Sequence, residues 1–220
     1  MATIAVENYL KRILLLSEGG EEVVPMGALA AALEVVPGTA TAMAKALAGE
    51  GLLEHQPRIG VRLTARGRRL ALNVLRKHRL VETFLVETLK MDWAEVHAEA
   101  ERLEHAVSDE VLDRIDALLG HPRLDPHGDP IPSRHGRLDS QVYATLATCA
   151  TGRRLRIVRV TQQSADFLHF AEESGLRPGT ELRVDDRNLT SGLVTLRRTD
   201  GSTLALGVAA AGSILVEPRA

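Results

Sequence analysis

Four ionisable side chains in one segment of helical pattern constrain this chain more than any other feature: His97, Glu101, Glu104 and His105. On an α-helix, at about 100° per residue, they fall within an arc of roughly 100° and form one wall of imidazole and carboxylate groups. A second pair, His78 and Glu82, has a four-residue spacing in the preceding helical stretch. Converging carboxylates repel one another by about 4 kcal/mol per close pair at an effective dielectric of 20. The pattern therefore predicts that these residues bind a divalent metal ion.

The spacing of the histidines predicts two metal sites. His97 and His105 are eight residues apart in the chain, which is about 12 Å along a helix axis, so one ion cannot bind both. We expect one site near His97 with His78 and Glu82, and another near Glu101, Glu104 and His105. Oxygen and nitrogen donors without a thiolate suit Mn²⁺ or Fe²⁺ better than Cu(I) or structural zinc. The alternative is a solvated helix face with i,i+4 pairs worth a few tenths of a kcal/mol each. The joint spacing of six such residues beside the apolar stripes favours the metal.

The N-terminal third has the pattern of a winged helix-turn-helix. Apolar spacing predicts a helix over residues 2–16, and proline and glycine positions delimit two short helices over 26–33 and 37–49. Residues 52–55 and 61–64 read as a hairpin, the wing. Longer helices are expected over 65–89, 93–107 and 109–119, and the hydroxyl of Ser108 is placed to cap the last of these.

Charge is distributed unevenly along the chain, although the net charge is only −2. Residues 55–81 carry eight Arg or Lys and no acid, whereas residues 82–116 carry eleven acids against three bases. Such an asymmetry indicates a polyanion-facing patch beside a cation-facing one. Thr39, Thr41 and Lys45 in the second short helix are candidates for contact with DNA bases or phosphates. Arg58 and Arg62 in the wing are candidates for contact with phosphates.

The C-terminal third changes to a strand pattern. Residues 121–140, rich in Pro, Gly and His, read as a linker. Strands are expected over 155–160, 181–185, 193–197 and 214–217, with a helix over 165–174, and short strands over about 70 residues suggest a small β-barrel. Cys149 is the only cysteine, which excludes an intrachain disulfide, and both Cys149 and Trp93 are expected in the core. No apolar run reaches membrane-span length, so we expect no membrane association and a reducing cytoplasm.

The chain resembles the diphtheria-toxin-repressor family of iron- and manganese-dependent transcriptional repressors over nearly its whole length. The resemblance rests on residues 7–10, the helix-turn-helix and three further segments: 76–82, 97–110 and 127–132. It implies a mainly α fold with β structure, in three domains. These are a winged helix-turn-helix DNA-binding domain over 1–72, a helical dimerisation and metal-binding domain with a linker over 73–140, and an SH3-like domain over 141–220, similar to ferrous-iron-transport accessory proteins.

The resemblance also implies a ligand set for each metal site. The regulatory site corresponds to Asn8, Glu101, Glu104 and His105. The second site corresponds to His78, Glu82 and His97, completed by Asp166 or by Asp125 and His127, and in some manganese-responsive relatives His78 serves the regulatory site instead. Iron-type members carry Cys or Met where this chain has Glu101, so Glu101 favours Mn²⁺. Asn8 stands where the family has Met or Asp and is a neutral oxygen donor.

We therefore expect a metal-dependent repressor that senses Mn²⁺ or Fe²⁺ and controls metal-homeostasis genes such as uptake transporters. Its partners would be double-stranded operator DNA and a second copy of the chain, since two recognition helices must match two half-sites. Two alternatives compete with this hypothesis. A di-metal carboxylate enzyme typically has two Glu-x-x-His motifs, whereas this chain has one Glu-x-x-Glu-His. A metal-buffering or peptide-binding adaptor built on the β-barrel leaves the wing and the arginine run without a role.

Overall fold

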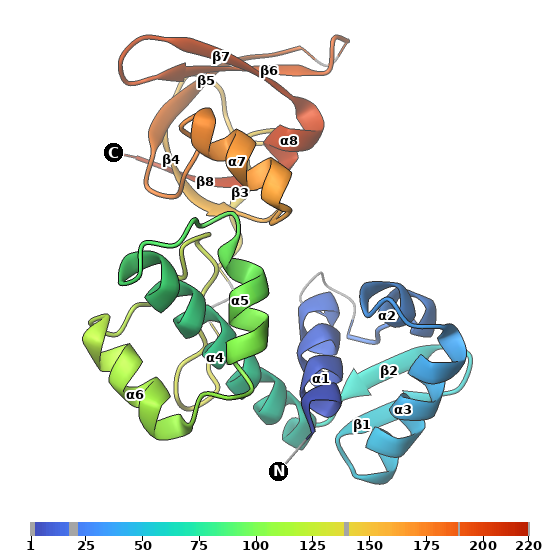
Figure 1. Ribbon diagram of the computed structural model, residues 1–220. Coiled ribbons are helices and arrows are strands. Elements are labelled where there is room, and N and C mark those ends of the chain that lie inside the picture. Colours follow the sequence, from blue (N-terminus) through green and yellow to red (C-terminus); the bar gives the residue numbers. More distant parts are fainter. Residues whose placement is uncertain (1–2, 18–21, 139–140, 189, 220) are drawn as a thin grey trace. The chain divides into compact units, whose positions relative to one another are not determined.

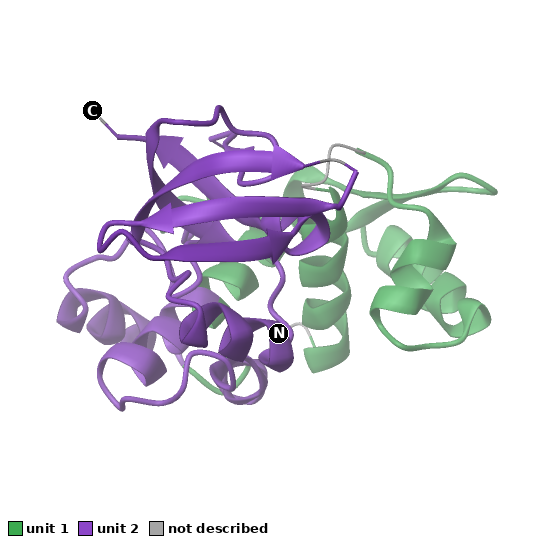
Figure 2. Ribbon diagram, turned by 90° about the horizontal axis from the view of Figure 1, so that it is seen from above, with its two compact units in different colours: residues 1–78, 104–107, 132–138 green, residues 79–103, 108–131, 139–220 purple. Residues whose placement is uncertain are grey.

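A computed structural model describes residues 3–17, 22–138, 141–188 and 190–219. The chain divides into two compact units, which Figure 2 distinguishes by colour. Unit 1 comprises residues 1–78, 104–107 and 132–138, and unit 2 comprises residues 79–103, 108–131 and 139–220. The boundary at residue 78 falls inside one continuous helix, so the units are interleaved in sequence.

Unit 1 holds the N-terminal helices and the hairpin. Its elements are α1 (Ile4–Ser17), α2 (Met26–Ala32), α3 (Pro37–Gly49), β1 (Leu53–Gln56), β2 (Gly60–Leu63) and the first part of α4 (Ala65–Glu87) (Figure 1). Leu10, Leu14 and Leu29 are fully buried in a core that α1, α2, α3 and α4 share with the hairpin. β1 and β2 pair antiparallel, and Val24 forms an isolated bridge with Val61. The predicted winged helix-turn-helix is thereby confirmed.

The turn between α2 and α3 explains how two apolar helices share one small core. Glu34 adopts a left-handed backbone with φ 54°, and Pro37 begins α3 at a position where its missing N–H costs nothing. The two helices are bent by 108° relative to each other. Within the described residues no single helix is long and apolar enough to cross a membrane, and only this bent pair, taken together, passes that test of length and composition.

Two helices of unit 2 follow the end of α4: α5 (Val96–Leu103) and α6 (Asp109–Leu118). The Ser108 hydroxyl accepts a hydrogen bond from the backbone N–H of Val111 at 3.3 Å, which confirms the predicted cap. The prediction of one helix over 93–107 was wrong at both ends. Residues 93–95 form a turn whose amides are tied to Asp92, because Ala94 N–H donates to the Asp92 side chain at 2.8 Å. Residues 104–106 form another turn.

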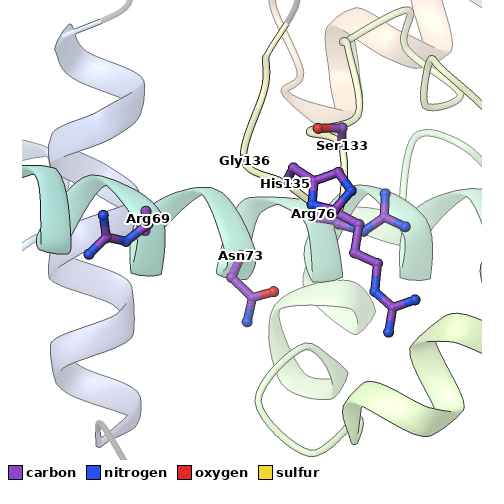
Figure 3. A pocket seen from close by; sticks show the side chains of 7 residues that line it. Arg69, Asn73, Arg76, Ser133, His135 and Gly136 are labelled. Carbon is purple, nitrogen blue, oxygen red and sulfur yellow. The ribbon is translucent and has the colours of Figure 1, made fainter.

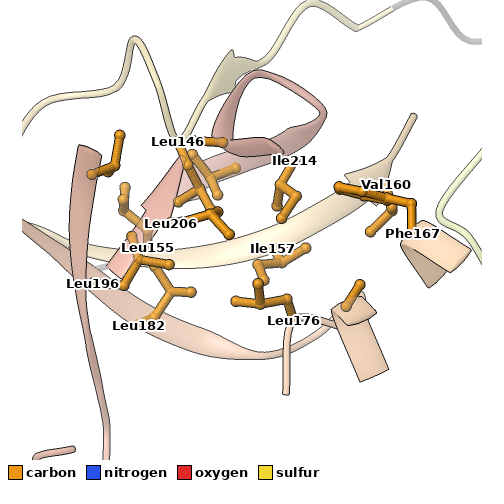
Figure 4. Close-up of a cluster of buried hydrophobic side chains, with 14 of the residues drawn as sticks. Leu146, Leu155, Ile157, Val160, Phe167, Leu176, Leu182, Leu196, Leu206 and Ile214 are labelled. Carbon is orange, nitrogen blue, oxygen red and sulfur yellow. The ribbon is translucent and has the colours of Figure 1, made fainter. Parts of the chain in front are cut away.

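A six-stranded antiparallel sheet occupies the rest of unit 2, in the order β3-β8-β4-β5-β6-β7. The elements are β3 (Ala144–Thr145), β4 (Arg154–Val160), α7 (Ala165–Glu173), β5 (Glu181–Asn188), β6 (Leu193–Arg198), β7 (Thr203–Gly207), α8 (Val208–Gly212) and β8 (Ile214–Pro218). Figure 4 shows the apolar side chains between the strands and α7. Trp93 and Cys149 belong to this core, as expected. The SH3-like fold class is confirmed, although the sequence patterns did not predict β3, β7 or α8.

The segment that was expected to be a linker contains a buried, hydrogen-bonded loop. Asp125, His127 and Asp129 are each less than 9% exposed. The Asp125 carboxylate accepts hydrogen bonds from the backbone N–H groups of His127 and Asp129, at 2.8 and 2.9 Å. The His127 carbonyl accepts a hydrogen bond from Val160 N–H in β4 at 2.8 Å. Residues 121–131 therefore pack as part of unit 2, whereas residues 132–138 belong to unit 1.

Gly128 is required by this packing, and we expect Gly128→Ala to destabilise the protein markedly. Its φ is +86°, and a Cβ there would lie 2.0 Å from the Val158 carbonyl oxygen. Gly152 is a matched control, because its φ is +78° and nothing lies within 4 Å of the position of its Cβ. A left-handed backbone alone costs about 1–2 kcal/mol for a non-glycine residue. In thermal unfolding Gly152→Ala should show only that loss, and Gly128→Ala a clearly larger one. Equal losses would contradict the close packing of the loop.

Candidate metal centres

A buried carboxylate organises the first cluster, which lies within unit 1. Glu104 has no exposed surface and Lys11 is 3% exposed. The Lys11 Nζ donates to both carboxylate oxygens of Glu104, at 2.7 and 2.8 Å. His78 Nδ1 lies 2.6 Å from the second of these oxygens. A buried charge is tolerated only when it is paired and hydrogen-bonded, and these contacts pair Glu104 on both oxygens.

His105 extends this cluster to the first helix. Its Nδ1 lies 2.6 Å from Glu7 Oε2 and its Nε2 lies 2.8 Å from Asn8 Oδ1. The same Nε2 is 3.3 Å from Glu104 Oε1. Three donors that the sequence predicted for one site, Asn8, Glu104 and His105, are therefore brought together.

Contacts with α1 and α4 also account for the early end of α5. Glu104 and His105 stand in the turn after Leu103, where Lys11 and His78 hold the first and Asn8 and Glu7 hold the second. Lys77 Nζ donates to the Val107 carbonyl at 3.0 Å and fixes the end of the same turn. The prediction that all four side chains lie on one helix was therefore wrong, because Glu104 and His105 lie beyond the end of α5.

The first cluster fits a divalent ion by its donors, but a lysine contacts the same carboxylate. Oxygen and nitrogen ligands about 2.1 Å from a hexacoordinate ion lie roughly 3 Å from one another. The separations of 2.8 and 3.3 Å from His105 Nε2 to Asn8 Oδ1 and Glu104 Oε1 match that spacing. The sequence patterns missed Lys11. A lysine three residues after Asn8, among buried neighbours on α1, was the signal that a buried acid lay opposite.

A second cluster lies in unit 2 and combines α4, α5 and the buried loop. Ligand atoms of Glu82, Asp125 and His127 lie within 4.8 Å of one another, and all three residues are buried. His97 Nδ1 lies 3.0 Å from Glu82 Oε1, and His97 Nε2 lies 3.6 Å from Glu101 Oε1. The predicted pairing of His97 with Glu82 is thus present.

The orientation of His127 indicates that its Nδ1 is available as a metal ligand. Its Nε2 lies 2.9 Å from the Trp93 carbonyl oxygen, which can only accept a hydrogen bond, so Nε2 carries the proton. In the neutral ring Nδ1 then bears a lone pair. Nδ1 has no hydrogen-bond partner in the described structure and faces Glu82 Oε2 and Asp125 Oδ1, both at 3.9 Å. A buried lone pair facing two carboxylates is unfavourable alone and suits a cation among them, so these residues fit a metal ion.

Asp125 carries the electrostatic cost of this second cluster. Burial raises the pKa of its carboxyl well above the ordinary value of 3.8, and the nearby charges of Asp129 and Glu82 raise it further. The Arg79 guanidinium, whose Nε is 3.7 Å from Asp125 Oδ2, opposes the increase in the pKa. Ionisation of Asp125 is therefore costly in this buried cluster, and a cation among these ligands would offset that cost.

Asp166 is placed differently from the other predicted ligands of the second site. It is an exposed residue in the first turn of α7. It does not belong to the group of donors that lie within 4.8 Å of one another around Glu82, as far as the described residues show. Its assignment as a ligand stays a prediction.

The predicted DNA contacts lie on α3 and the wing, and they differ in exposure and in the partners that they already have within the protein. Thr39 and Lys45 on α3 and Arg58 at the hairpin turn are exposed. Thr41 is partly buried and its hydroxyl donates to the Pro37 carbonyl at 2.8 Å. The Arg62 guanidinium binds Glu54 Oε2 at 2.7 Å and lies 3.6 Å from Glu22. Arg58 therefore offers a more available charge than Arg62.

Unit 1 also contains a basic cavity of about 200 Å³ between α4 and the turn after Pro132 (Figure 3). Its described lining residues include three arginines and a histidine and no acid: Arg69, Asn73, Arg76, Ser133, Arg134, His135 and Gly136. Arg76 Nη1 donates to the Pro132 carbonyl at 2.9 Å and so holds the turn against the helix. Arg69 and Arg76 of the predicted arginine run therefore line this cavity.

Three family models match the chain in succession. Residues 1–61 match the N-terminal DNA-binding domain of the iron-dependent repressors, and residues 64–133 match their metal-binding and dimerisation domain. Residues 144–218 match the FeoA domain.

Individual proteins show the same likeness. The iron-dependent repressor IdeR of Mycobacterium leprae is 37% identical over 71% of this chain and 64% of its own length, so the chain spans less than two thirds of that relative. The diphtheria toxin repressor of Corynebacterium efficiens is 33% identical over 81% of each chain. Among solved structures, a manganese-dependent transcriptional repressor in complex with manganese matches with a TM-score of 0.89 and 39% identity, over 97% of this chain and all of that one.

We expect Asp125→Asn to stabilise the metal-free protein at neutral pH and to weaken its response to metal. Because the pKa of Asp125 is raised on folding, ionisation lowers the free energy of unfolding progressively as the pH rises from 3.8 through the raised pKa. Asn lacks this cost and keeps the Oδ1 that accepts both loop amides. In a chelator-treated sample at pH 7 the melting temperature should rise, by about 2–4 °C for each 1 kcal/mol gained in a chain of this length.

Added Mn²⁺ should then raise the melting temperature of the wild type more than that of the variant. Asp116→Asn is the control, because Asp116 lies outside the cluster and pairs with His121, and it should leave the response to metal intact. A lower melting temperature of metal-free Asp125→Asn would contradict the electrostatic argument.

Proposed function

The chain belongs to the family of iron-dependent repressors, and from that premise we propose that it is a DNA-binding transcriptional repressor activated by a divalent metal ion. It senses Mn²⁺ or Fe²⁺ and controls genes of metal homeostasis, such as those of uptake transporters. One observation carries the proposal. His105 Nε2 lies 2.8 Å from Oδ1 of Asn8, which stands on α1, the helix that precedes the DNA-binding helices in the chain, and 3.3 Å from Glu104 Oε1.

The regulatory site consists of Asn8, Glu101, Glu104 and His105, with His78 as a further ligand. The convergence of Asn8, Glu104 and His105 supports this set, and the contact of His78 with Glu104 at 2.6 Å supports placing His78 here. Glu101, three residues before Glu104 in the chain, is included on its spacing in the sequence and on the family resemblance. A divalent ion supplies two positive charges at this point, which offset the carboxylates.

The second site consists of Glu82, His97, Asp125 and His127. Support comes from the unpartnered Nδ1 of His127 and from the close approach of Glu82, Asp125 and His127. Asp166 is retained as a predicted further ligand. The hydrogen bond from His127 Nε2 to the Trp93 carbonyl fixes the ring so that Nδ1 faces the carboxylates.

Mn²⁺ is proposed ahead of Fe²⁺ because the donor atoms are all oxygen and nitrogen, and because Glu101 stands where iron-type relatives carry Cys or Met. A hard carboxylate-rich set suits Mn²⁺. The 39% identical neighbour is described as a manganese-dependent repressor in complex with manganese, which agrees with this choice.

In the proposed switch, residues of the metal site attach α1 to the rest of the protein. Asn8, Glu104 and His105 join α1 to the turn between α5 and α6, in the segment that matches the dimerisation domain. In a homodimer this link restricts the separation of two recognition helices, which must match half-sites about 34 Å apart. The metal ion shifts the protein toward the DNA-competent arrangement. The shift in free energy equals the difference between the metal's binding free energies for the two arrangements.

The proposed partners are operator DNA and a second copy of the chain, and the proposed location is the cytoplasm, where the chromosome lies. The relatives are named repressors, which favours this function over the enzymatic and adaptor alternatives.

His105→Gln should abolish metal-dependent operator binding, because it removes the ligand that links α1 to Glu104. Fluorescence anisotropy with DNA from the promoter region of the chain's own gene, at fixed salt, would measure binding with Mn²⁺, with Fe²⁺ under anaerobic conditions, with Zn²⁺ and with chelator. His121→Gln is the control, since His121 is an exposed partner of Asp116, and it should bind as the wild type does. Equal wild-type binding in metal and in chelator would refute metal-dependent repression.

Arg58→Ala should weaken binding to all DNA sequences alike and flatten the dependence of log K on log salt by about one unit, because it removes one phosphate contact. Arg62→Ala should have a smaller effect on the slope, because Glu54 already pairs with that guanidinium. Salt titrations of both variants on operator and random DNA would measure the difference. A loss confined to the operator would instead mean that Arg58 reads bases.

A further inference from the structure

Lys11 contacts the carboxylate that the regulatory site needs. It is a buried residue of α1, and its Nζ bonds to Glu104 Oε1 and Oε2 at 2.7 and 2.8 Å. His78 contacts one oxygen at 2.6 Å and His105 the other at 3.3 Å. Both carboxylate oxygens of Glu104 are therefore satisfied without an ion.

A divalent ion at Glu104 meets two obstacles in this arrangement. The ion must take at least one oxygen from Lys11, and it must approach a fixed positive charge in a buried environment, where like charges repel strongly. Lysine is a compact point charge on a flexible four-carbon stem, so exchange is possible, but the chain loses two charge-assisted hydrogen bonds when it occurs.

We propose that Lys11 is an internal cation that competes with the metal ion for Glu104 and thereby sets the metal concentration at which the regulatory site fills. This inference rests on the proposed function, because it concerns the affinity of the same site. In the absence of metal Lys11 keeps α1 joined to Glu104, and on binding it is displaced. Lys11 is thus a residue that tunes affinity without serving as a ligand.

The test measures metal affinity directly, by calorimetric titration of Mn²⁺ into chelator-treated full-length protein. The background is Asp125→Asn/His127→Gln, which disables the second site and lets the first report alone. Lys11→Met keeps the length of the side chain and removes the charge, and we expect it to bind Mn²⁺ at least tenfold more tightly. Arg12→Met is the matched control, because it removes the adjacent positive charge on α1, which the structure does not place on Glu104, and its dissociation constant should stay within about threefold of the background.

Thermal unfolding provides a second readout: the increase in melting temperature on adding Mn²⁺. This increase is compared within each variant, so a change in the stability of the metal-free variant does not affect the comparison. Lys11→Met leaves the Glu104 carboxylate buried without its cation, so the metal-free melting temperature should fall and Mn²⁺ should restore it by a larger increment than in the background protein. The double change Lys11→Met/Glu104→Gln removes both charges and should lose the increment. Lys11→Gln replaces Lys11→Met in both measurements if the latter does not fold.

The outcomes separate this inference from the proposed function. Unchanged or weaker Mn²⁺ binding by Lys11→Met, in a background that does bind Mn²⁺, would overturn the role of Lys11 and leave metal sensing intact. Binding by Lys11→Met where the background binds none would support the inference in its strongest form, with the lysine blocking the site. An absence of binding in both proteins, and in the wild type, would overturn the inference together with the proposed function.

Discussion

The buried Glu104 carboxylate is the constraint on which the rest of unit 1 depends. A carboxylate with no exposed surface costs several kcal/mol unless positive or hydrogen-bonding groups surround it. Lys11 from α1 and His78 from α4 supply those groups, and His105 approaches from the adjacent position. Because these partners come from three separate segments, one acid fixes the position of α1 against α4 and the turn. The helix-turn-helix follows α1 directly, so its attachment depends on the same carboxylate.

The two clusters hold their acids by different means when no metal is present. Glu104 is paired with the Lys11 ammonium group, whereas burial and the charges of Asp129 and Glu82 raise the pKa of Asp125. An ion at the first cluster must therefore replace a tethered lysine, whereas an ion at the second offsets the cost of ionising Asp125. Because ligation requires an ionised carboxylate, metal binding at the second cluster should strengthen as the pH rises. An ion at the first cluster instead approaches the positive charge of Lys11.

Local patterns predicted most of the fold. Proline and glycine punctuation placed α2 and α3 within one residue, because their boundaries are determined by backbone chemistry. The spacing of Glu82 and His97 indicated a cluster that the structure contains. Predictions failed where distant contacts decide the conformation. The helix before Glu104 ends early because Lys11 of α1 and His78 of α4 hold the turn that follows it. Part of the Pro-rich segment is buried because Arg79 and the β4 backbone bind it. Lys11 was overlooked for the same reason, since its partner lies 93 residues away.

Contacts within the protein limit how strong the proposed switch can be. Allosteric coupling equals the difference in the metal's binding free energy between two states of the protein. Lys11–Glu104 and Asn8–His105 already join α1 to the turn, so an ion replaces one link by another and does not create a link where none exists. Only the difference in geometry and strength between the two links contributes to coupling. A graded response of about 5- to 150-fold in DNA affinity, the usual range of 1–3 kcal/mol, therefore fits this arrangement better than an all-or-none transition, which needs about 5.5 kcal/mol of differential binding.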